Sequence, residues 1–259
     1  MKRFITLTFL TVVFGFSAVA QTPTPTPDPN PDKTRADRLQ ARLNDFANLA
    51  RYREANSKLA PPAKDENRVV FMGDSITDSW KLTEYFPGLP YVNRGISGQT
   101  TSQMVLRFRP DVIHLKPKVV VILAGTNDIS GNTGATTLTT IEENLASMVD
   151  LAHANGINVV LASVMPISDY NKNAQGVPIV RSVQRPPAQI LALNSWIKNL
   201  CAERDLVYLD YFTAMADDKG FLKADIANDG LHPNAKGYEL IKPLFENAIK
   251  TALKKKQKR

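Results

Sequence analysis

Residues 69–77 place the tightest constraint on how this chain can fold. They begin as a continuous apolar and β-branched run, a pattern typical of a strand buried on both faces of a parallel sheet. The run breaks at Gly73 and presents a carboxylate, Asp74, and a hydroxyl, Ser75, in adjacent positions. Open α/β folds build their sites at the carboxyl ends of such strands. Because Gly, Asp and Ser also form ordinary turns, the rest of the chain decides between the two interpretations.

Five apolar runs are predicted as strands, at residues 68–72, 90–93, 119–123, 157–161 and 206–209. Segments with apolar residues at helical spacing separate them, as in residues 137–154 and 235–253. Continuous runs separated by helices indicate a parallel sheet between two layers of helices. We therefore predict an α/β protein, a single-domain three-layer α/β/α sandwich with a five-stranded parallel sheet.

The amino-terminal residues have the pattern of an exported protein. Lys2 and Arg3 precede a short apolar stretch, and residues 18–20 read Ala-Val-Ala, which is typical of a signal-peptide cleavage site. A membrane span needs ~20 apolar residues, so cleavage is favoured over stable membrane insertion. The expected organisation is a signal peptide at 1–20, a Pro/Thr-rich linker at 21–33 and one folded domain at 34–259. The expected location is periplasmic or extracellular.

The folded domain is expected to open with an amphipathic helix from Thr34 to the mid-50s and to end in a basic tail. The formal charge is +7, and residues 254–259 contribute much of it. No aromatic residue interleaves the tail, as a stacking platform for nucleic acid would require. We therefore expect a solvated tail and no nucleic-acid partner. The single cysteine, Cys201, is expected to be a buried small hydrophobe.

Three histidines narrow the search for a catalytic base. A serine nucleophile needs a base and a group that orients that base. His232 follows Asp229 by three residues, so the carboxylate can bind one imidazole nitrogen while the other faces a hydroxyl. His114 lies in a connection and His153 on the polar side of a predicted helix, so neither is expected to act in catalysis. The segment around His232 can also be no more than the turn that starts the last helix.

An ester or amide hydrolase also needs hydrogen-bond donors directed at the oxyanion. Gly98 offers a backbone N–H at a helix start, and Asn127 offers a side-chain amide after the strand at 119–123. Ser75 can add its own N–H. Turn formation explains Asn127 equally well. The carboxyl ends of parallel strands share one rim, so all of these groups can meet there.

Four stretches together resemble the sequence blocks of the GDSL or SGNH hydrolases. They are Gly73-Asp74-Ser75-Ile76, Asn93-x-Gly95-x-x-Gly98, Gly125-Thr126-Asn127-Asp128 and Asp229-x-x-His232. Their order and spacing match as well, over residues 66–252. In detail the chain is similar to the branch that includes platelet-activating-factor acetylhydrolase catalytic subunits and bacterial lysophospholipase-like esterases. The one departure in the first block is Ile76, where Leu is commoner.

The resemblance implies a flavodoxin-like SGNH hydrolase fold and a chemistry without cofactor or metal. It implies Ser75 as nucleophile, His232 as base and Asp229 as the partner that orients His232. Gly98 and Asn127 would complete the oxyanion hole with the N–H of Ser75. The resemblance assigns no counterpart to the amino-terminal helix or to residues 168–187.

We therefore predict a secreted serine esterase that acts on small-molecule or glycan esters, with short acyl groups such as acetyl, since no lid-like apolar insertion follows the motifs. The oligomeric state stays open. Alternatives are a lysophospholipase or thioesterase for longer acyl chains, and a non-catalytic surface binding module that retains the fold. A metallophosphoesterase is disfavoured, because two metals need several His and carboxylate ligands and only His232 is well placed.

Overall fold

The computed structural model describes residues 31–256. The chain divides into two compact units, one ending at Ala41 and one beginning at Arg42. Helix α1 (Pro31–Asn44) begins in the first unit. The signal peptide expected at 1–20 and most of the linker expected at 21–33 lie outside the described residues. Within residues 31–256, no helix has both the length and the apolar character that crossing a membrane requires.

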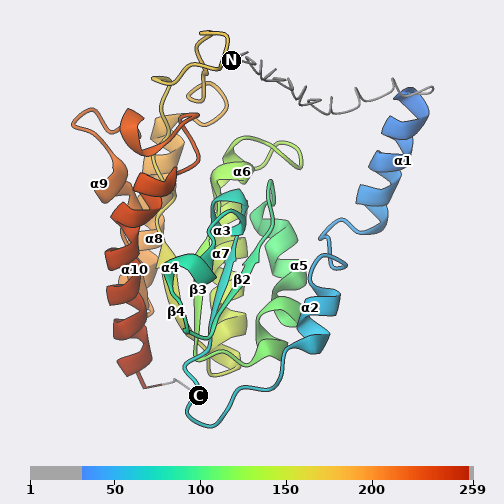
Figure 1. The fold of residues 1–259 in the computed structure, drawn as a ribbon, viewed down its shortest axis with the longest axis vertical. Coiled ribbons are helices and arrows are strands. Elements are labelled where there is room, and N and C mark those ends of the chain that lie inside the picture. Colours follow the sequence, from blue (N-terminus) through green and yellow to red (C-terminus); the bar gives the residue numbers. More distant parts are fainter. Residues whose placement is uncertain (1–30, 257–259) are drawn as a thin grey trace, which may run out of the picture. The chain divides into compact units, whose positions relative to one another are not determined.

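Five strands form one sheet in the second unit. They are β1 (Val69–Gly73), β2 (Tyr91–Gly95), β3 (Val119–Leu123), β4 (Asn158–Ala162) and β5 (Val207–Leu209). Their order is β2-β1-β3-β4-β5, and every neighbouring pair is parallel. In Figure 1 the strands labelled β2, β3 and β4 lie between the helices. The predicted α/β class and five-stranded parallel sheet are confirmed.

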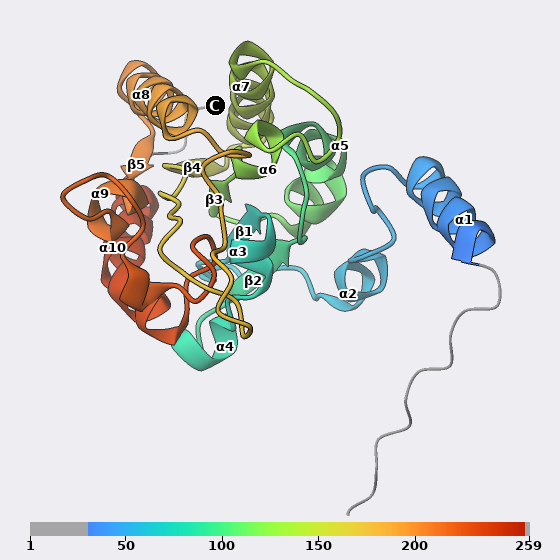
Figure 2. The same ribbon diagram turned by 90° about the horizontal axis from the view of Figure 1, so that it is seen from above.

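The helices of the second unit precede, connect and follow the strands. They are α2 (Arg53–Lys58), α3 (Ser75–Asp78), α4 (Leu82–Tyr85), α5 (Thr101–Asp111), α6 (Thr126–Ile129), α7 (Leu138–Ala154), α8 (Pro187–Glu203), α9 (Tyr211–Met215) and α10 (Ala235–Lys254). Two short 3₁₀ helices, η1 (Ile113–Leu115) and η2 (Ala224–Ile226), complete the set. Seen from above, α5, α7 and α8 cover one face of the sheet, and α4, α9 and α10 cover the other (Figure 2). This is the predicted three-layer sandwich.

Each face of the sheet buries its own apolar cluster. Along β1, Val70 and Met72 pack with α5, α7 and α8, whereas Val69 and Phe71 pack with α10, because alternate strand residues face opposite sides. All four side chains are at most 2% exposed. Burying a side chain of this size contributes about 1.5–3 kcal/mol. Burial on both faces explains why the strand reads as an unbroken apolar run.

The predicted helix from Thr34 to the mid-50s is wrong in its extent. Helix α1 ends at Asn44, and α2 begins only at Arg53. Between them, Asp45 accepts hydrogen bonds from the N–H groups of Leu49 and Ala50 at 2.7 and 2.9 Å. Asn48 has a φ of 54°, a left-handed conformation that does not continue a helix. An acidic side chain that binds nearby backbone therefore breaks the helical pattern.

The strand order reverses direction between β1 and β3. Chain segments leave β1 toward β2 on one side and continue from β3 toward β4 on the other. Open α/β sheets carry their binding crevice at such a point, outside the carboxyl ends of the strands. The Gly73–Ser75 and Gly125–Asp128 motifs follow β1 and β3 directly, so both open onto this crevice.

Candidate active site

Ser75 lies directly after β1, at the first residue of α3. The preceding Asp74 is the helix N-cap, and its Oδ1 accepts the N–H of Ile76 at 3.0 Å. This side-chain cap satisfies a backbone donor that the short helix cannot satisfy itself. The turn leaves Ser75 half-buried while its neighbours Asp74 and Ile76 are buried. The candidate nucleophile Ser75 is therefore accessible at the rim of the sheet. The Asp74 cap holds its backbone in place.

A hydrogen-bonded chain joins Ser75, His232 and Asp229. The Oγ of Ser75 lies 2.9 Å from Nε2 of His232, and Nδ1 of His232 lies 2.7 Å from Oδ2 of Asp229. A carboxylate can only accept, so Nδ1 carries the proton and Nε2 is free to accept from the serine hydroxyl. The structure brings the three residues together although Ser75 and His232 are 157 positions apart. The arrangement can deprotonate the hydroxyl and stabilise the resulting imidazolium.

The backbone around Asp229 fixes the carboxylate from the other side. Its Oδ1 accepts the N–H of Leu231 at 3.0 Å and the N–H of His232 at 2.8 Å. Partial burial raises the pKa of Asp229, but the hydrogen bonds and charge of His232 and the Leu231 N–H outweigh it and hold that pKa well below its usual range. Asp229 therefore remains a carboxylate at neutral pH.

Gly230 lets the Asp229–His232 segment approach the loop that follows β4. Its φ is +73°, and an added Cβ would lie 2.1 Å from the backbone oxygen of Ser168. Left-handed φ and this close approach both require glycine. Backbone conformation and packing therefore require the glycine at position 230, and the chemistry of the site does not.

At the rim, the turn that carries Asn127 is hydrogen-bonded to the turn that carries Gly98. The Nδ2 of Asn127 donates to the backbone oxygen of Gln99 at 3.1 Å, and Asn127 is only 4% exposed. An amide nitrogen carries two N–H groups, so one remains for an oxyanion. Gly98 is exposed with a φ of +79°, and among residues 31–256 its N–H has no hydrogen-bond acceptor. Each predicted donor therefore keeps an N–H without an acceptor, on two turns that are bonded to each other.

Side-chain hydrogen bonds lock these turns together. Asp128 accepts the N–H of Thr101 at 2.9 Å, which joins the turn after β3 to the start of α5. Asp78 accepts the N–H of Ser97 at 3.2 Å and its hydroxyl at 2.7 Å, which joins α3 to the turn after β2. The buried Arg107 donates to the backbone oxygen of Gly73 at 3.1 Å. The turns after β1, β2 and β3 therefore form one bonded unit.

Asp74 is a buried acid beside the nucleophile. Burial raises its pKa from 3.8 to about 6, while the Ile76 N–H and the charge of His232 lower it and Asp128 raises it. Its Oδ2 has no hydrogen-bond partner among the described residues. An unpaired buried carboxylate oxygen favours the protonated form.

Two arginines that the sequence analysis does not single out also contact this site. Arg181 and Arg185 both come from residues 168–187, which link β4 to α8. Arg181 forms an ion pair with Oδ2 of Asp229 at 2.8 Å, and Arg185 lies within 3.4 Å of Oδ1 of Asn127. The segment is polar and contains prolines but carries no periodic pattern, so the sequence alone gives no signal for either contact.

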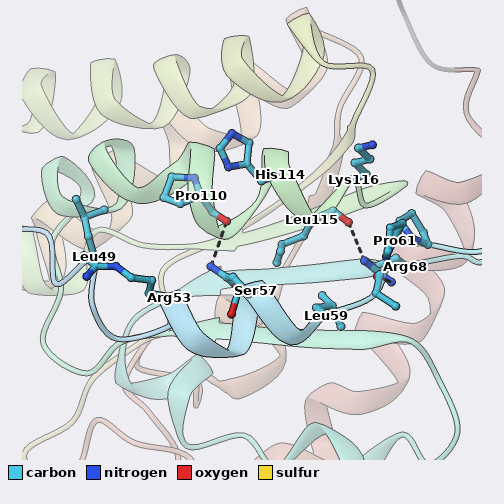
Figure 3. A pocket seen from close by; sticks show the side chains of 13 residues that line it. Leu49, Arg53, Ser57, Leu59, Pro61, Arg68, Pro110, His114, Leu115 and Lys116 are labelled. Carbon is cyan, nitrogen blue, oxygen red and sulfur yellow. Dashed lines mark hydrogen bonds between the residues drawn. The ribbon is translucent and has the colours of Figure 1, made fainter.

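The two other histidines lie elsewhere. His114 is exposed in η1, before β3, and lines an open hollow of about 530 Å³ together with Arg53 and Lys116 (Figure 3). His153 lies in the last turn of α7 and lines a different hollow with Asn158 at the start of β4. Both hollows are at the amino ends of the strands, whereas Ser75 follows a carboxyl end. In the described part of the chain, no cluster of three or more His, Cys, Asp or Glu side chains is arranged to hold a metal ion.

The chain matches a known family model and solved structures. The model of the GDSL-like lipase/acylhydrolase family matches residues 71–240. A solved GDSL-like lipase from Bacteroides thetaiotaomicron VPI-5482 is 40% identical with a TM-score of 0.73, over 80% of this chain and 99% of that one.

Curated relatives match a shorter part of the chain. Lipoprotein YqeF of Bacillus subtilis (strain 168) is 35% identical over 122 residues, which are 40% of this chain and 50% of YqeF. The platelet-activating factor acetylhydrolase IB subunit alpha1 of Rattus norvegicus is 31% identical over 96 residues, which are 34% of this chain and 40% of that subunit. The matched region spans half or less of each of these curated relatives.

Proposed function

Since the chain belongs to the GDSL-like lipase/acylhydrolase family, we propose that Ser75, His232 and Asp229 hydrolyse carboxylic esters through an acyl-enzyme intermediate. Membership of this family supports a carboxylic ester hydrolase and argues against the metallophosphoesterase. The hydrogen-bonded chain from Ser75 Oγ through His232 to Asp229 carries the proposal, with separations of 2.9 and 2.7 Å. An intact chain of this kind also argues against a non-catalytic binding module.

The proposed reaction begins with attack of Ser75 Oγ on the ester carbonyl carbon. His232 Nε2 takes the hydroxyl proton, and Asp229 stabilises the imidazolium through Nδ1–H. The tetrahedral intermediate collapses, His232 returns the proton to the leaving alcohol, and the acyl group stays on Ser75. A water molecule, deprotonated by His232, then releases the carboxylic acid and restores the serine.

In this proposal the oxyanion is held by N–H groups of Ser75, Gly98 and Asn127. The N–H of Gly98 without an acceptor and the spare N–H of the Asn127 amide support the assignment. Donors of this kind are already oriented before the reaction, so charge development costs little reorganisation.

We propose short acyl groups, acetyl above all, on a small-molecule or glycan ester. The apolar hollow behind the nucleophile, lined by Ile76, Leu123 and Leu231 among others, has no room for even a water molecule. This hollow therefore cannot take up a long acyl chain. One observation favours the alternative of a lysophospholipase or thioesterase: Val177, Val180 and Val183 are more than half exposed on the loop that carries Arg181.

Export remains part of the proposal, with a signal peptide at 1–20, a linker at 21–33 and the hydrolase domain at 34–259. The name lipoprotein for the Bacillus relative is consistent with a location outside the cytoplasm. Amino-terminal sequencing of protein from the extracytoplasmic fraction should begin at Gln21. An intact Met1 in that fraction would contradict export by cleavage.

Turnover of a chromogenic ester series tests the function. The wild-type chain should hydrolyse acetyl and butyryl esters with higher kcat/KM than a palmitoyl ester, and a serine-directed inhibitor should stop it while a chelator should not. Ser75→Ala should lower kcat by about 10⁴-fold or more. A Ser75→Ala variant with wild-type turnover would overturn the proposed mechanism, and a preference for palmitoyl would establish the alternative substrate class.

A further inference from the structure

The loop at residues 168–187 contacts the site through two cationic side chains, Arg181 and Arg185. We propose that both are positioning residues, Arg181 for the carboxylate of Asp229 and Arg185 for the amide of Asn127. The proposal rests on the proposed function, because it assigns a purpose to the orientation of those two groups. It gives the loop a role that acts through Asp229 and Asn127.

The backbone that carries Arg181 is itself held in place. Asp169 accepts the N–H of Arg181 at 2.5 Å, the N–H of Ser182 at 3.0 Å and the Ser182 hydroxyl at 2.5 Å. Burial raises the pKa of Asp169, but these hydrogen bonds outweigh it, so the net shift is downward. Asp169 therefore stays ionised at neutral pH and anchors the turn from which Arg181 extends.

The same loop is bonded to the segment that carries Asp229. The N–H of Ser168 donates to the backbone oxygen of Gly230 at 2.9 Å, and Nδ2 of Asn171 donates to the backbone oxygen of Ala227 at 2.9 Å. Figure 2 shows the loop after β4 beside the segment that precedes α10. Arg181 thus acts between two segments that are already docked.

Arg181 holds Asp229 at two points. Its Nε donates to the backbone oxygen of Asp229 at 2.9 Å, and its Nη2 donates to Oδ2 at 2.8 Å. The same Oδ2 accepts Nδ1–H of His232 at 2.7 Å. A planar guanidinium that bridges backbone and carboxylate fixes the carboxylate rotation, which a point charge cannot do. Together with the N–H groups of Leu231 and His232, which hold Oδ1, Arg181 fixes the direction in which Oδ2 faces His232.

Arg185 acts on the other half of the site. It is 6% exposed, its Nε donates to Oγ1 of Thr126 at 3.2 Å, and its Nη2 lies 3.4 Å from Oδ1 of Asn127. A guanidinium has donors only, so the amide atom facing it must be the oxygen. The Asn127 nitrogen is then turned toward Gln99 and the rim, which is the orientation that oxyanion binding needs.

Kinetics of matched variants test the role of Arg181. Arg181→Gln should lower kcat for a chromogenic acetyl ester between about 10- and 100-fold, since a misplacement of about 1 Å can cost 100-fold. KM and the thermal midpoint should change little. Arg181→Lys keeps the charge without the fork and should recover only part of kcat. Lys172→Gln removes a cation from the same loop, at an exposed position without a side-chain partner among the described residues, and should match wild type.

A spectroscopic arm separates this proposal from the proposed function. The Nδ1 proton of His232, hydrogen-bonded to a carboxylate, should give a low-field proton resonance in the wild-type chain and in Lys172→Gln. In Arg181→Gln that resonance should move and broaden. Equal kcat and an unchanged resonance in Arg181→Gln would overturn the positioning role. If Ser75→Ala kept wild-type turnover, the mechanism would fall, yet the resonance would still decide whether Arg181 orients Asp229.

A double-mutant cycle tests Arg185. If Arg185 acts through Asn127, Arg185→Met should lower kcat about 10-fold in the wild-type background and have almost no further effect in an Asn127→Ala background. Equal losses in both backgrounds would show that Arg185 acts independently of Asn127 and overturn the proposal. Arg185→Lys retains the buried charge and serves as the second variant if Arg185→Met proves unstable by its thermal midpoint.

Discussion

Two kinds of segment build the site, and they differ in the contacts that hold them in place. We call residues 73–75, 95–98, 125–128 and 229–232 the rim segments, and residues 168–187 the loop. The first three rim segments lie at the carboxyl ends of β1, β2 and β3, whereas residues 168–186 of the loop form no helix or strand and Pro187 begins α8. The rim segments carry every group proposed to touch substrate, and the loop carries the two cations that orient them.

The rim segments and the loop are held in place by different contacts. The rim segments are bonded to one another and to buried backbone, as when Arg107 donates to Gly73 and Asp128 accepts from Thr101. The loop is held by the bonds of Ser168 and Asn171 to the segment before α10 and by side chains such as Asp169 and Tyr170, and it leaves valines exposed. The groups proposed to react thus lie on rigid elements. The two arginines proposed to orient them lie on a surface loop, whose sequence can vary at low cost to the stability of the fold. Four predictions test this division.

The largest effect should come from the base. His232→Ala removes the only proton acceptor within hydrogen-bond distance of Ser75 in the described residues, so kcat should fall by about 10⁴-fold or more. The measurement is steady-state kinetics with an acetyl ester. His114→Ala and His153→Ala are the controls and should stay near wild type, since both side chains lie at the amino ends of the strands. Damage from either control instead would place the chemistry outside the rim segments.

The next effect should come from Asn127→Ala. If its amide donates to the oxyanion, the bond forms mainly in the transition state, so kcat should fall far more than KM rises. Loss of one such donor typically lowers kcat about 10²–10³-fold, or roughly 3–4 kcal/mol. A residue that only forms a turn would instead cost on the order of 1 kcal/mol of stability. A variant that melts early yet keeps kcat would remove Asn127 from the mechanism.

The sequence alone predicts the strands that carry the rim segments because the signals for those strands are local. The strand predicted at 119–123 is β3 (Val119–Leu123) as observed, since an unbroken apolar run can only be buried on both faces. Helix α7 begins at Leu138 because Thr137 accepts the N–H of Thr140, a cap that is visible in the sequence. The positions of Ser75 and His232 follow from the motifs that surround them.

The sequence does not predict how the loop is used, because its partners are distant along the chain. Arg181 binds Asp229 across 48 positions, and Arg185 reaches Asn127 across 58. No periodicity links such pairs. The break after α1 is missed for a different reason, since the competition of Asp45 for backbone N–H groups depends on geometry that helical spacing does not encode.

A third, smaller effect concerns stability within the rim. The pKa of Asp74 is raised from 3.8 to about 6, chiefly by burial. The native state therefore holds its proton more tightly than the unfolded chain does. Below pH 4 both states are protonated and nothing is lost; as the pH rises from about 4 to 6, only the unfolded chain releases its proton and stability falls. The loss is complete above pH 6 and is on the order of 3 kcal/mol at most.

Asp74→Asn should remove this dependence. The amide oxygen can still accept the N–H of Ile76, and the variant carries no charge to desolvate. The free energy of unfolding at pH 8 should therefore exceed that of wild type, whereas at pH 4 the two should agree more closely. Urea unfolding at both pH values measures the difference. A wild-type stability that does not fall between pH 4 and 6 relative to Asp74→Asn would show that Asp74 ionises at its ordinary pKa.

The smallest effect should come from the exposed valines of the loop. The side chain of Val183 is 78% exposed, so Val183→Ser removes little that a short acyl group can touch. The kcat/KM for an acetyl ester should stay within about two-fold of wild type, because one buried methylene in a substrate pocket is worth about 1–3 kcal/mol and an exposed one far less.

The same variant is more informative with a palmitoyl ester. If a long acyl chain lies along the loop, the palmitoyl-to-acetyl ratio of kcat/KM should drop several-fold, and the loop would then select substrate as well as orient the rim segments. An unchanged ratio restricts the loop to the contacts of Arg181 and Arg185.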